Sequence, residues 1–244
     1  MFVFAYGVVA YVVFLLSFLY AIGFVENWVV ARTIDGTTRV GGGLGVWLGN
    51  AFLLGLFAAQ HSLMARPGFK RAWTRIVPPA MERSTFVLAS SLLLMLLFLF
   101  WTPIPGEVWN VGVNPVGFAF EMLSYVGWAI VLVATFQLDH FELFGLKQVF
   151  LHQRGEPLPE PRFEIPPLYR WVRHPIYLGF LLAFWSTPRM TLGHLLFAVL
   201  TTGYILFAVR LEEHDLTSVH HEYRAYQARV PMLLPLKPPL PAEE

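Results

Sequence analysis

The strongest constraint in this sequence is a series of long apolar runs that carry almost no charge. A helix needs about 20 mostly apolar residues to cross the hydrocarbon core of a bilayer. Only 14% of the residues are charged, whereas a soluble domain usually carries about 25%. Four runs have the required length and composition: Phe2–Val25, Val46–Met64, Ser84–Trp101 and Gly117–Leu138. We therefore expect an all-α, polytopic membrane protein, and because no basic segment precedes the first run, we expect that run to be a retained helix.

Two further apolar segments follow a polar stretch, Asp139–His174, that is rich in proline and charge. Ile176–Thr187 is only twelve residues long, which corresponds to about 18 Å of helix and falls short of a full crossing. Leu192–Val209 is longer, and Pro188 lies in the break between the two segments. We therefore expect five or six transmembrane helices, the last two of which form a tilted hairpin.

Lysine and arginine are distributed unevenly between the two sides that this topology defines. The stretches 65–83, 139–175 and 210–244 fall on one side and together hold 14 of the 17 basic residues, whereas Arg32, Arg39 and Arg189 fall on the other. Cytoplasmic loops of membrane proteins carry an excess of lysine and arginine. Both termini are therefore expected to be cytoplasmic.

The composition also excludes several kinds of chemistry. The chain has no cysteine, which removes disulfides, thiolate metal sites and a cysteine nucleophile. Its formal net charge is +1, so nucleic acid is not expected as a partner. The histidines and carboxylates show no coherent metal-ligand spacing, and we expect no metal site.

One ordered motif brackets the C-terminal hairpin. It begins with Arg173-His174-Pro175-Ile-Tyr177-Leu-Gly179, continues after the hairpin with Glu212-Glu213, and ends with Tyr223-Arg-Ala-Tyr226 and Pro231. This order resembles the membrane methyltransferases typified by isoprenylcysteine carboxyl methyltransferase and the phospholipid methyltransferases. The resemblance covers residues 169–235. It implies one membrane domain over residues 1–244, with a four-helix part at 1–138 and a cofactor-binding loop, hairpin and tail at 139–244.

The resemblance implies S-adenosylmethionine as the methyl donor, bound in a pocket at the cytoplasmic edge. Arg173 or His174 can bind the donor carboxylate, because arginine forms bidentate hydrogen bonds to carboxylates. Glu212 or Glu213 can pair with the donor ammonium. The candidate cofactor-binding residues are Tyr169, Arg173, His174, Pro175, Tyr177, Glu212 and Glu213. Tyr169 and Tyr177 are expected beside the adenosine, and Pro175 is expected to start a helix.

Three other segments narrow the resemblance. They begin at Gln60-His61, at Asp139-His140 and at Pro188-Arg189, and they resemble the bacterial methanethiol S-methyltransferases. That family implies a small thiol as acceptor and a multi-pass location in the bacterial inner membrane. Prenylcysteine enzymes tend to have an arginine four residues before the cofactor-binding glutamate, and this chain has Ala208 there. The departure argues against a carboxylate acceptor and fits an uncharged thiol.

Methyl transfer from a sulfonium is a direct displacement and needs no enzyme nucleophile. The thiolate is the reactive form of a thiol and a simple alkyl thiol is mostly protonated at pH 7, so a general base is expected to help. The candidate base is His140, with Asp139 or another carboxylate orienting it, and His61 is the alternative. These three residues are the predicted catalytic group.

Other functions are compatible with parts of the pattern. The chain could methylate another lipophilic acceptor, or it could be a non-enzymatic accessory protein of nitrogen-oxide metabolism, because proteins of that kind share similar segments. Membrane sterol reductases share features of the C-terminal half, but this sequence shows no second basic cluster for the 2′-phosphate of NADPH. The sequence leaves the oligomeric state open.

Overall fold

The computed structural model describes residues 1–158, 163–219 and 221–241. Within these ranges, five helices are long and apolar enough to cross a membrane. They are α1 (Phe2–Val25), α2 (Leu44–Ala65), α4 (Pro79–Phe100), α5 (Pro115–Gln137) and α9 (Leu192–Val219). The prediction of an all-α polytopic membrane protein is confirmed.

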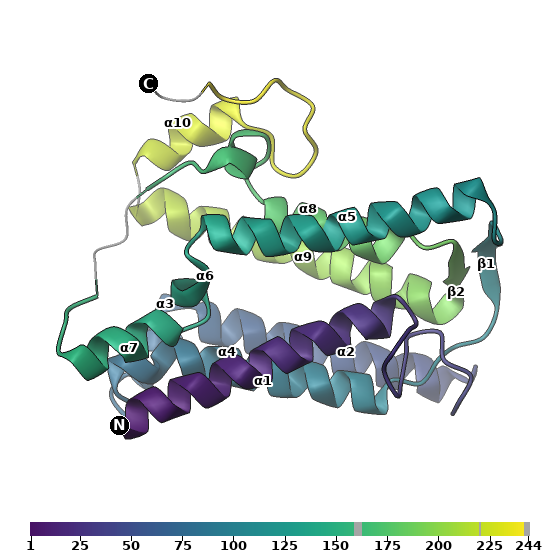
Figure 1. The fold of residues 1–244 in the computed structure, drawn as a ribbon, viewed down its shortest axis with the longest axis horizontal. Helices are drawn as coiled ribbons and strands as arrows, with labels where there is room; N and C mark the ends of the chain where they lie inside the picture. Colours follow the sequence, from purple (N-terminus) through teal and green to yellow (C-terminus); the bar gives the residue numbers. More distant parts are fainter. Residues whose placement is uncertain (159–162, 220, 242–244) are drawn as a thin grey trace.

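Shorter elements gather at the two ends of the long helices (Figure 1). One end, here called the basic end, holds α3 (Pro67–Trp73), α6 (His140–Leu143), α7 (Leu146–Arg154), η1 (Pro167–Arg170) and α10 (Glu222–Arg229). The other, here called the strand end, holds β1 (Glu107–Asn110) and β2 (Arg189–Thr191). The short helix α8 (Pro175–Trp185) lies alongside the long helices.

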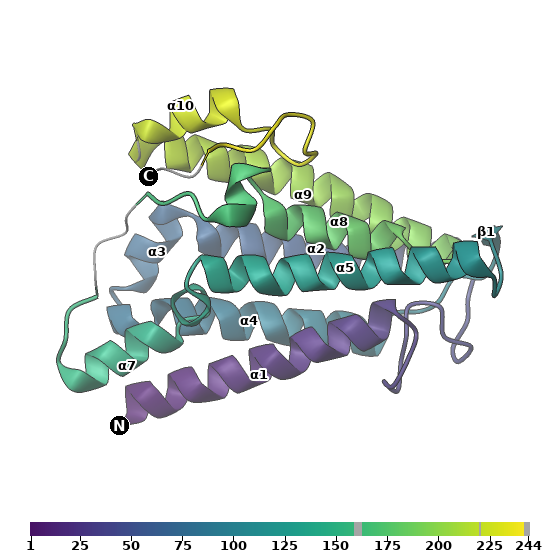
Figure 2. The same cartoon turned by 45° about the horizontal axis from the view of Figure 1, so that its top comes forward.

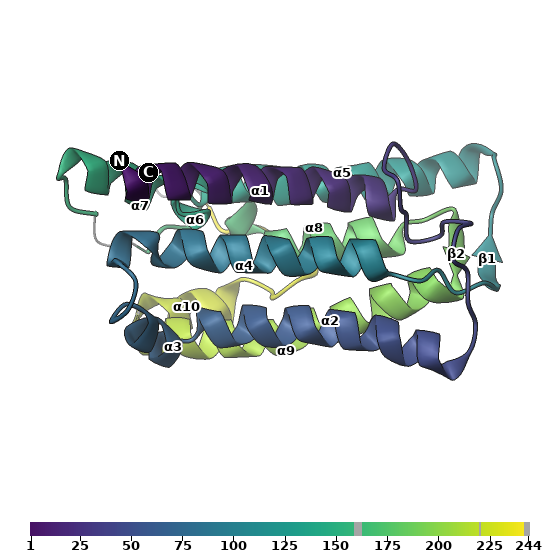
Figure 3. The same cartoon turned by 90° about the horizontal axis from the view of Figure 1, so that it is seen from below.

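The chain runs back and forth between these ends, so the three lysine- and arginine-rich stretches share one end. In Figures 1 and 3, α3, α7 and α10 lie at the same end as the start of α1. This arrangement agrees with the alternation that the charge distribution predicts.

The closest helix packing joins α5 to α8, with α1 packed on α4, while α2 contacts both α4 and α9 (Figure 2). Gly127 of α5 and Gly179 of α8 face each other where the first pair crosses. A Cβ atom on Gly127 would lie 2.6 Å from the Gly179 carbonyl oxygen, and one on Gly179 would lie 2.6 Å from the Gly127 carbonyl oxygen. Small residues allow membrane helices to approach closely, so Gly179 provides backbone contact with α5.

The two final helices differ in length from the segments expected. α8 has only 11 residues and ends at Trp185, and it packs more extensively on α5 than on α9. α9 has 28 residues and continues beyond Val209 to Val219, or about 42 Å of helix. The extension places Glu212 and Glu213 on a continuous helix at the basic end.

A two-stranded antiparallel sheet closes the strand end, a feature the sequence did not predict. Arg189 of β2 pairs with Asn110 of β1, and the Arg189 side chain binds Glu107 at 2.7 Å between Nε and Oε1. The indole Nε1 of Trp109 also donates to the Thr187 carbonyl at 2.9 Å. The sheet therefore joins the loop before α5 to the turn between α8 and α9.

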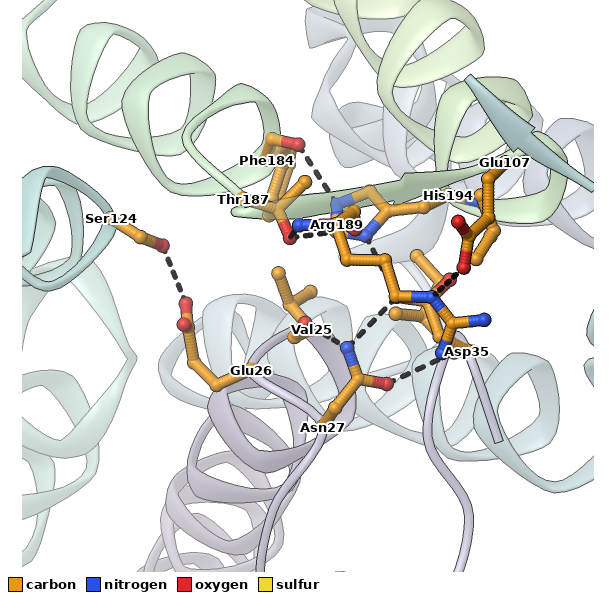
Figure 4. Close-up of polar contacts among 12 residues, drawn as sticks. Val25, Glu26, Asn27, Asp35, Glu107, Ser124, Phe184, Thr187, Arg189 and His194 are labelled. Carbon is orange, nitrogen blue, oxygen red and sulfur yellow. Dashed lines mark hydrogen bonds and ion pairs between the residues drawn. The ribbon is translucent and has the colours of Figure 1, made fainter. Parts of the chain in front are cut away.

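A buried histidine connects the loop after α1 to the region between α8 and α9, next to this sheet (Figure 4). The His194 ring is fully buried, with Nδ1 3.1 Å from Asp35 Oδ2 and Nε2 2.9 Å from the Phe184 carbonyl. Burial alone would raise the pKa of Asp35, but hydrogen bonds and charge from His194, together with hydrogen bonds from Thr191 and Asn27, lower that pKa overall. Asp35 is therefore an ionised carboxylate that holds the loop in place.

Candidate functional site

Arg173 and Glu213 form a closely bonded pair at the basic end. Arg173 Nε donates to Glu213 Oε1 at 2.7 Å, and the two side chains are only 10% and 12% exposed. His174 Nε2 donates to the same oxygen at 2.9 Å, and Gln227 Nε2 donates to Oε2 at 2.7 Å. Both oxygens of Glu213 are therefore engaged by the protein itself.

The same arginine holds the C-terminal tail against the start of α8. Arg173 Nη1 donates to the carbonyls of Gln227 at 3.0 Å and Val230 at 2.6 Å, and its backbone N–H donates to the Pro231 carbonyl at 2.9 Å. The backbone N–H of His174 continues this contact by donating to the Met232 carbonyl. Within the described residues, Nη2 is the guanidinium nitrogen left without a hydrogen bond.

Glu212 has a different environment from its neighbour. Its side chain is 44% exposed, and Oε2 accepts a hydrogen bond from the Tyr177 hydroxyl at 3.0 Å. His174 Nδ1 lies 3.9 Å from the same oxygen. Adjacent residues on an α-helix point about 100° apart, so one glutamate enters the Arg173 pair while the other faces Tyr177 and keeps an accessible carboxylate.

The residues at the start of α8 explain where this helix begins relative to the cluster. Pro175 occupies the first turn of α8, where its missing N–H costs nothing because that donor has no partner within a helix anyway. His174 is the N-cap residue, and both residues are buried. The proline therefore fixes the point at which the chain enters the helix and places His174 at the N-cap.

Tyrosines from η1 and α10 cover the cluster on the tail side. The Tyr226 hydroxyl donates to the Tyr169 carbonyl at 2.6 Å. Burial raises the pKa of Tyr169, and the nearby Glu212 carboxylate adds to this effect. Tyr223 is also buried, and its hydroxyl has no hydrogen-bond partner within the described residues. Buried polar groups are nearly always paired, so this hydroxyl is suited to a ligand or a bound water.

His140 lies in a cage of aromatic rings between α1, α5 and the chain that follows α5. Its ring stacks on Phe136 with centroids 4.3 Å apart, and rings of Tyr11 and Phe144 approach at 5.8 and 4.8 Å. The ring is 6% exposed. Burial lowers the pKa of His140, and the Asp139 carboxylate opposes this shift without reversing it. The ring is therefore neutral at pH 7.

Within the described residues, the Asp139 carboxylate makes no hydrogen bond to the His140 ring and instead binds groups of α6 and α7. Its carboxylate accepts from the Glu142 N–H at 3.1 Å and binds Lys147 Nζ at 2.6 Å. Burial alone would raise the pKa of Asp139, but the hydrogen bond from Lys147 and backbone hydrogen bonds lower it overall. Asp139 caps α6 in the left-handed region at φ 62°, which explains why it faces away from its neighbour.

His61 lies among α2, α4 and α9. Its Nδ1 is 3.3 Å from Ser90 Oγ, and its ring packs against Phe86 at 4.8 Å and Tyr204 at 6.4 Å between centroids. The Tyr204 hydroxyl in turn accepts from Ser62 Oγ at 3.2 Å. Side chains of α4 and α9, which are far from α2 in the sequence, therefore pack against His61.

Most of the sequence-predicted site residues meet in one place. Arg173, His174, Tyr177, Glu212 and Glu213 form a connected cluster, with Tyr169 beside it. His140 and His61 occupy two separate settings, with no hydrogen bond to the cluster or to each other within the described residues. The sequence alone did not indicate a role for five further residues that contact these side chains from other elements: Tyr11, Thr135, Ser90, Tyr204 and Gln227.

Fold and site together define a polytopic membrane protein with a charge-paired polar cluster at the basic end of its helices. The family described as "Protein of unknown function (DUF1295)" matches residues 81–230. No solved structure matches.

Relatives with a named function identify the family more specifically than the family model does. The chain is 54% identical to the methanethiol S-methyltransferase of Mycobacterium tuberculosis, with 94% of each chain covered. It is 50% identical to methanethiol S-methyltransferase 1 of Bradyrhizobium diazoefficiens, covering 95% of this chain and 81% of the relative. Nurim of Xenopus laevis is 33% identical over 67% of this chain and 60% of its own length. The chain belongs to the methanethiol S-methyltransferase family, which confirms the resemblance read from its motifs.

Proposed function

We propose that this protein transfers a methyl group from S-adenosylmethionine to methanethiol and releases dimethyl sulfide. The names of its relatives support this acceptor. The observation that carries the proposal is the difference between the two adjacent glutamates: Glu213 is bound by Arg173 and His174, whereas Glu212 keeps an accessible carboxylate beside Tyr177.

The residues of the cluster fit the chemistry of the donor. Glu212 pairs with the ammonium, since a partly exposed carboxylate with one hydrogen bond has capacity for further donors. The open Nη2 of Arg173 meets the carboxylate, and the unpaired Tyr223 hydroxyl supplies another donor nearby. Tyr169 and Tyr177 provide aromatic surface for the adenosine. His174 and Pro175 hold these groups in place.

When bound, the donor supplies a methyl group on a positively charged sulfur. The protein must align the acceptor sulfur with that methyl group, exclude water and accept the proton of the thiol. The thiol S–H bond breaks, its proton passes to a histidine nitrogen, and the sulfur electron pair forms the new bond to carbon. The bond from that carbon to the sulfonium breaks, and its electron pair remains on the sulfonium sulfur and cancels its charge. Of the predicted group of His140, His61 and Asp139, the two histidines are the proposed proton acceptors, since the Asp139 carboxylate is bound to Lys147.

The location follows from the same chemistry. We place the protein in the bacterial inner membrane with both termini in the cytoplasm, in agreement with the excess of lysine and arginine at the basic end. The donor is charged and cytoplasmic, so a cluster at that end is accessible to it. The acceptor is apolar enough to arrive through the bilayer.

Detergent-purified protein with S-adenosylmethionine and methanethiol tests the proposal. We expect S-adenosylhomocysteine in solution and dimethyl sulfide in the headspace to appear in equal amounts. Donor binding without either product would reject methanethiol and keep a methyl-transfer site open to another lipophilic acceptor. A folded protein that binds no adenosyl compound would overturn the proposal and favour an accessory role.

A further inference from the structure

The two candidate histidines are held in the same way at one ring nitrogen. Thr135 Oγ1 donates to the Leu132 carbonyl at 2.7 Å and lies 2.9 Å from His140 Nδ1. Ser90 Oγ donates to Gln60 Oε1 at 3.2 Å and lies 3.3 Å from His61 Nδ1. A hydroxyl that has donated its proton elsewhere can only accept from the ring. With each hydroxyl proton directed to that oxygen acceptor, a neutral imidazole carries its own proton on Nδ1 and its basic lone pair on Nε2.

The two basic nitrogens differ in what they face. His140 Nε2 lies 2.9 Å from the Tyr11 hydroxyl, which donates to it, and aromatic rings enclose the remaining surface of the imidazole. Each nitrogen of His140 therefore has a partner. This satisfied, enclosed ring anchors α6 against α1 and α5, and an acceptor thiol would have to displace Tyr11 to reach it.

His61 Nε2 has no hydrogen-bond partner within the described part of the chain. The residue is not at the lipid-facing side of its helix, because it shares a face of α2 with the buried Asn50, Leu54 and Met64. Phe57 and Phe86 supply apolar surface beside the ring, at 5.3 and 4.8 Å between centroids. The setting combines an open basic nitrogen with apolar walls, which suits a small apolar thiol.

We propose that His61 is the base that accepts the thiol proton and that Ser90 is the positioning residue that keeps Nε2 available for it. This inference rests on the proposed thiol methylation. The S–H proton moves to Nε2 and gives an imidazolium with protons on both nitrogens, while the sulfur electron pair attacks the methyl carbon. His140 has a structural role in this assignment.

The surroundings of His61 contain few ionisable groups that could take over the role. Tyr204 faces the ring from α9, and Arg83 acts on it electrostatically from α4. Arginine stays protonated at any ordinary pH and cannot accept the proton. The Tyr204 hydroxyl is a weaker base than imidazole, so His61 is the group suited to neutral pH.

Two matched substitutions separate the histidines, since each removes one hydroxyl that contacts an imidazole. Ser90→Ala is expected to lower kcat for methanethiol about fivefold to tenfold, the equivalent of one hydrogen bond, and Ser90→Thr should restore it. Tyr11→Phe is expected to leave kcat within twofold. His61→Gln should lower kcat by about 10²-fold to 10⁴-fold, the usual contribution of a general base. Binding of S-adenosylhomocysteine, measured by calorimetry, should be unchanged in all four variants.

Changing the acidity of the acceptor thiol tests whether His61 is a general base or a histidine with only a structural role. An aromatic thiol is more acidic than an alkyl thiol and is more often ionised at pH 7, so the loss in His61→Gln should shrink for it. A structural defect would reduce the rate for both acceptors alike, and that outcome would overturn the assignment.

A second measurement, of the His61 tautomer by NMR, does not depend on enzyme activity. The ¹⁵N ring signals of His61 in donor-free protein should report a proton on Nδ1, and this preference should weaken in Ser90→Ala and persist in Ser90→Thr. An unchanged tautomer in Ser90→Ala, or a large loss of kcat in Tyr11→Phe with normal folding, would reject the inference and leave thiol methylation standing. A wild-type protein that binds the donor and methylates no thiol would reject both.

Discussion

Arg173 Nε and Glu213 Oε1 are 2.7 Å apart, in a pair that also contacts His174, Gln227 and the tail. The two most prominent charges of the C-terminal motif are thus bound to each other. This pairing joins the start of α8, the end of α9 and the tail into one unit, and it leaves Glu212 to face the outside of the unit.

The two glutamates should therefore respond differently to the same substitution. Glu212→Gln is expected to weaken S-adenosylhomocysteine binding about tenfold or more, because a hydrogen bond to a charged group contributes about 1.5–3 kcal/mol, while the thermal unfolding temperature stays near that of wild type. Glu213→Gln is expected to destabilise the protein by about 3–5 kcal/mol, since it leaves a nearly buried guanidinium without its partner. Calorimetry and thermal unfolding in detergent measure the two effects. Equal losses of affinity at normal stability would contradict this division of roles.

The α5–α8 crossing should not tolerate a methyl group. Gly127→Ala places a Cβ 2.6 Å from both the Gly179 carbonyl oxygen and the Ala183 nitrogen. Backbone cannot move aside as a flexible side chain can, so we expect a loss of about 1–3 kcal/mol in stability. Gly203→Ala on α9 is the matched control, because nothing lies within 4 Å of its Cβ position. Thermal unfolding in one detergent compares them, and equal melting temperatures would refute the packing argument.

The Asp35–His194 contact should make stability depend on pH at the acidic end. The pKa of Asp35 is lower in the folded protein than in the unfolded chain, so its contribution is complete above the unfolded pKa of about 4 and is lost as the pH falls through the folded value. Thermal unfolding between pH 3 and pH 7 should show this loss in wild type. Asp35→Asn should melt lower than wild type at pH 7 and show a flatter dependence. Parallel curves for the two proteins would rule out Asp35 as the source.

Asp139 should prove dispensable for catalysis. Its side chain caps α6 and binds Lys147, and within the described residues it makes no hydrogen bond to the His140 ring. Asn also caps helices and tolerates left-handed backbone, so Asp139→Asn is expected to keep kcat within twofold and to cost only the exposed ion pair, about 0.2–1 kcal/mol. Asp139→Ala, which lacks a capping oxygen, should melt lower. A hundredfold loss of kcat in a stable Asp139→Asn protein would return Asp139 to the catalytic group.

The sequence determined the features that depend on local composition. The cost of placing charge in hydrocarbon makes each apolar run readable by itself, so the long helices and the shared side of the basic stretches were predicted. The ordered motif from Arg173 to Pro231 identified the family, and its residues do meet in space. Composition did not determine where the helices end: α9 continues past Val209 to Val219, and Glu212 and Glu213 on this extension have partners on α8 and α10.

Only the tertiary structure decided how these residues divide their roles. Which glutamate pairs with Arg173 depends on the rotation of α9 against α8, and the hydrogen bond between Ser90 and His61 depends on α2 packing beside α4. The pairing of β1 with β2, and the contact of Gly127 with Gly179, join segments more than 50 residues apart. Such contacts are set by the packing of whole helices and not by the local preference of either segment, so a single sequence holds the residues without showing which of them touch.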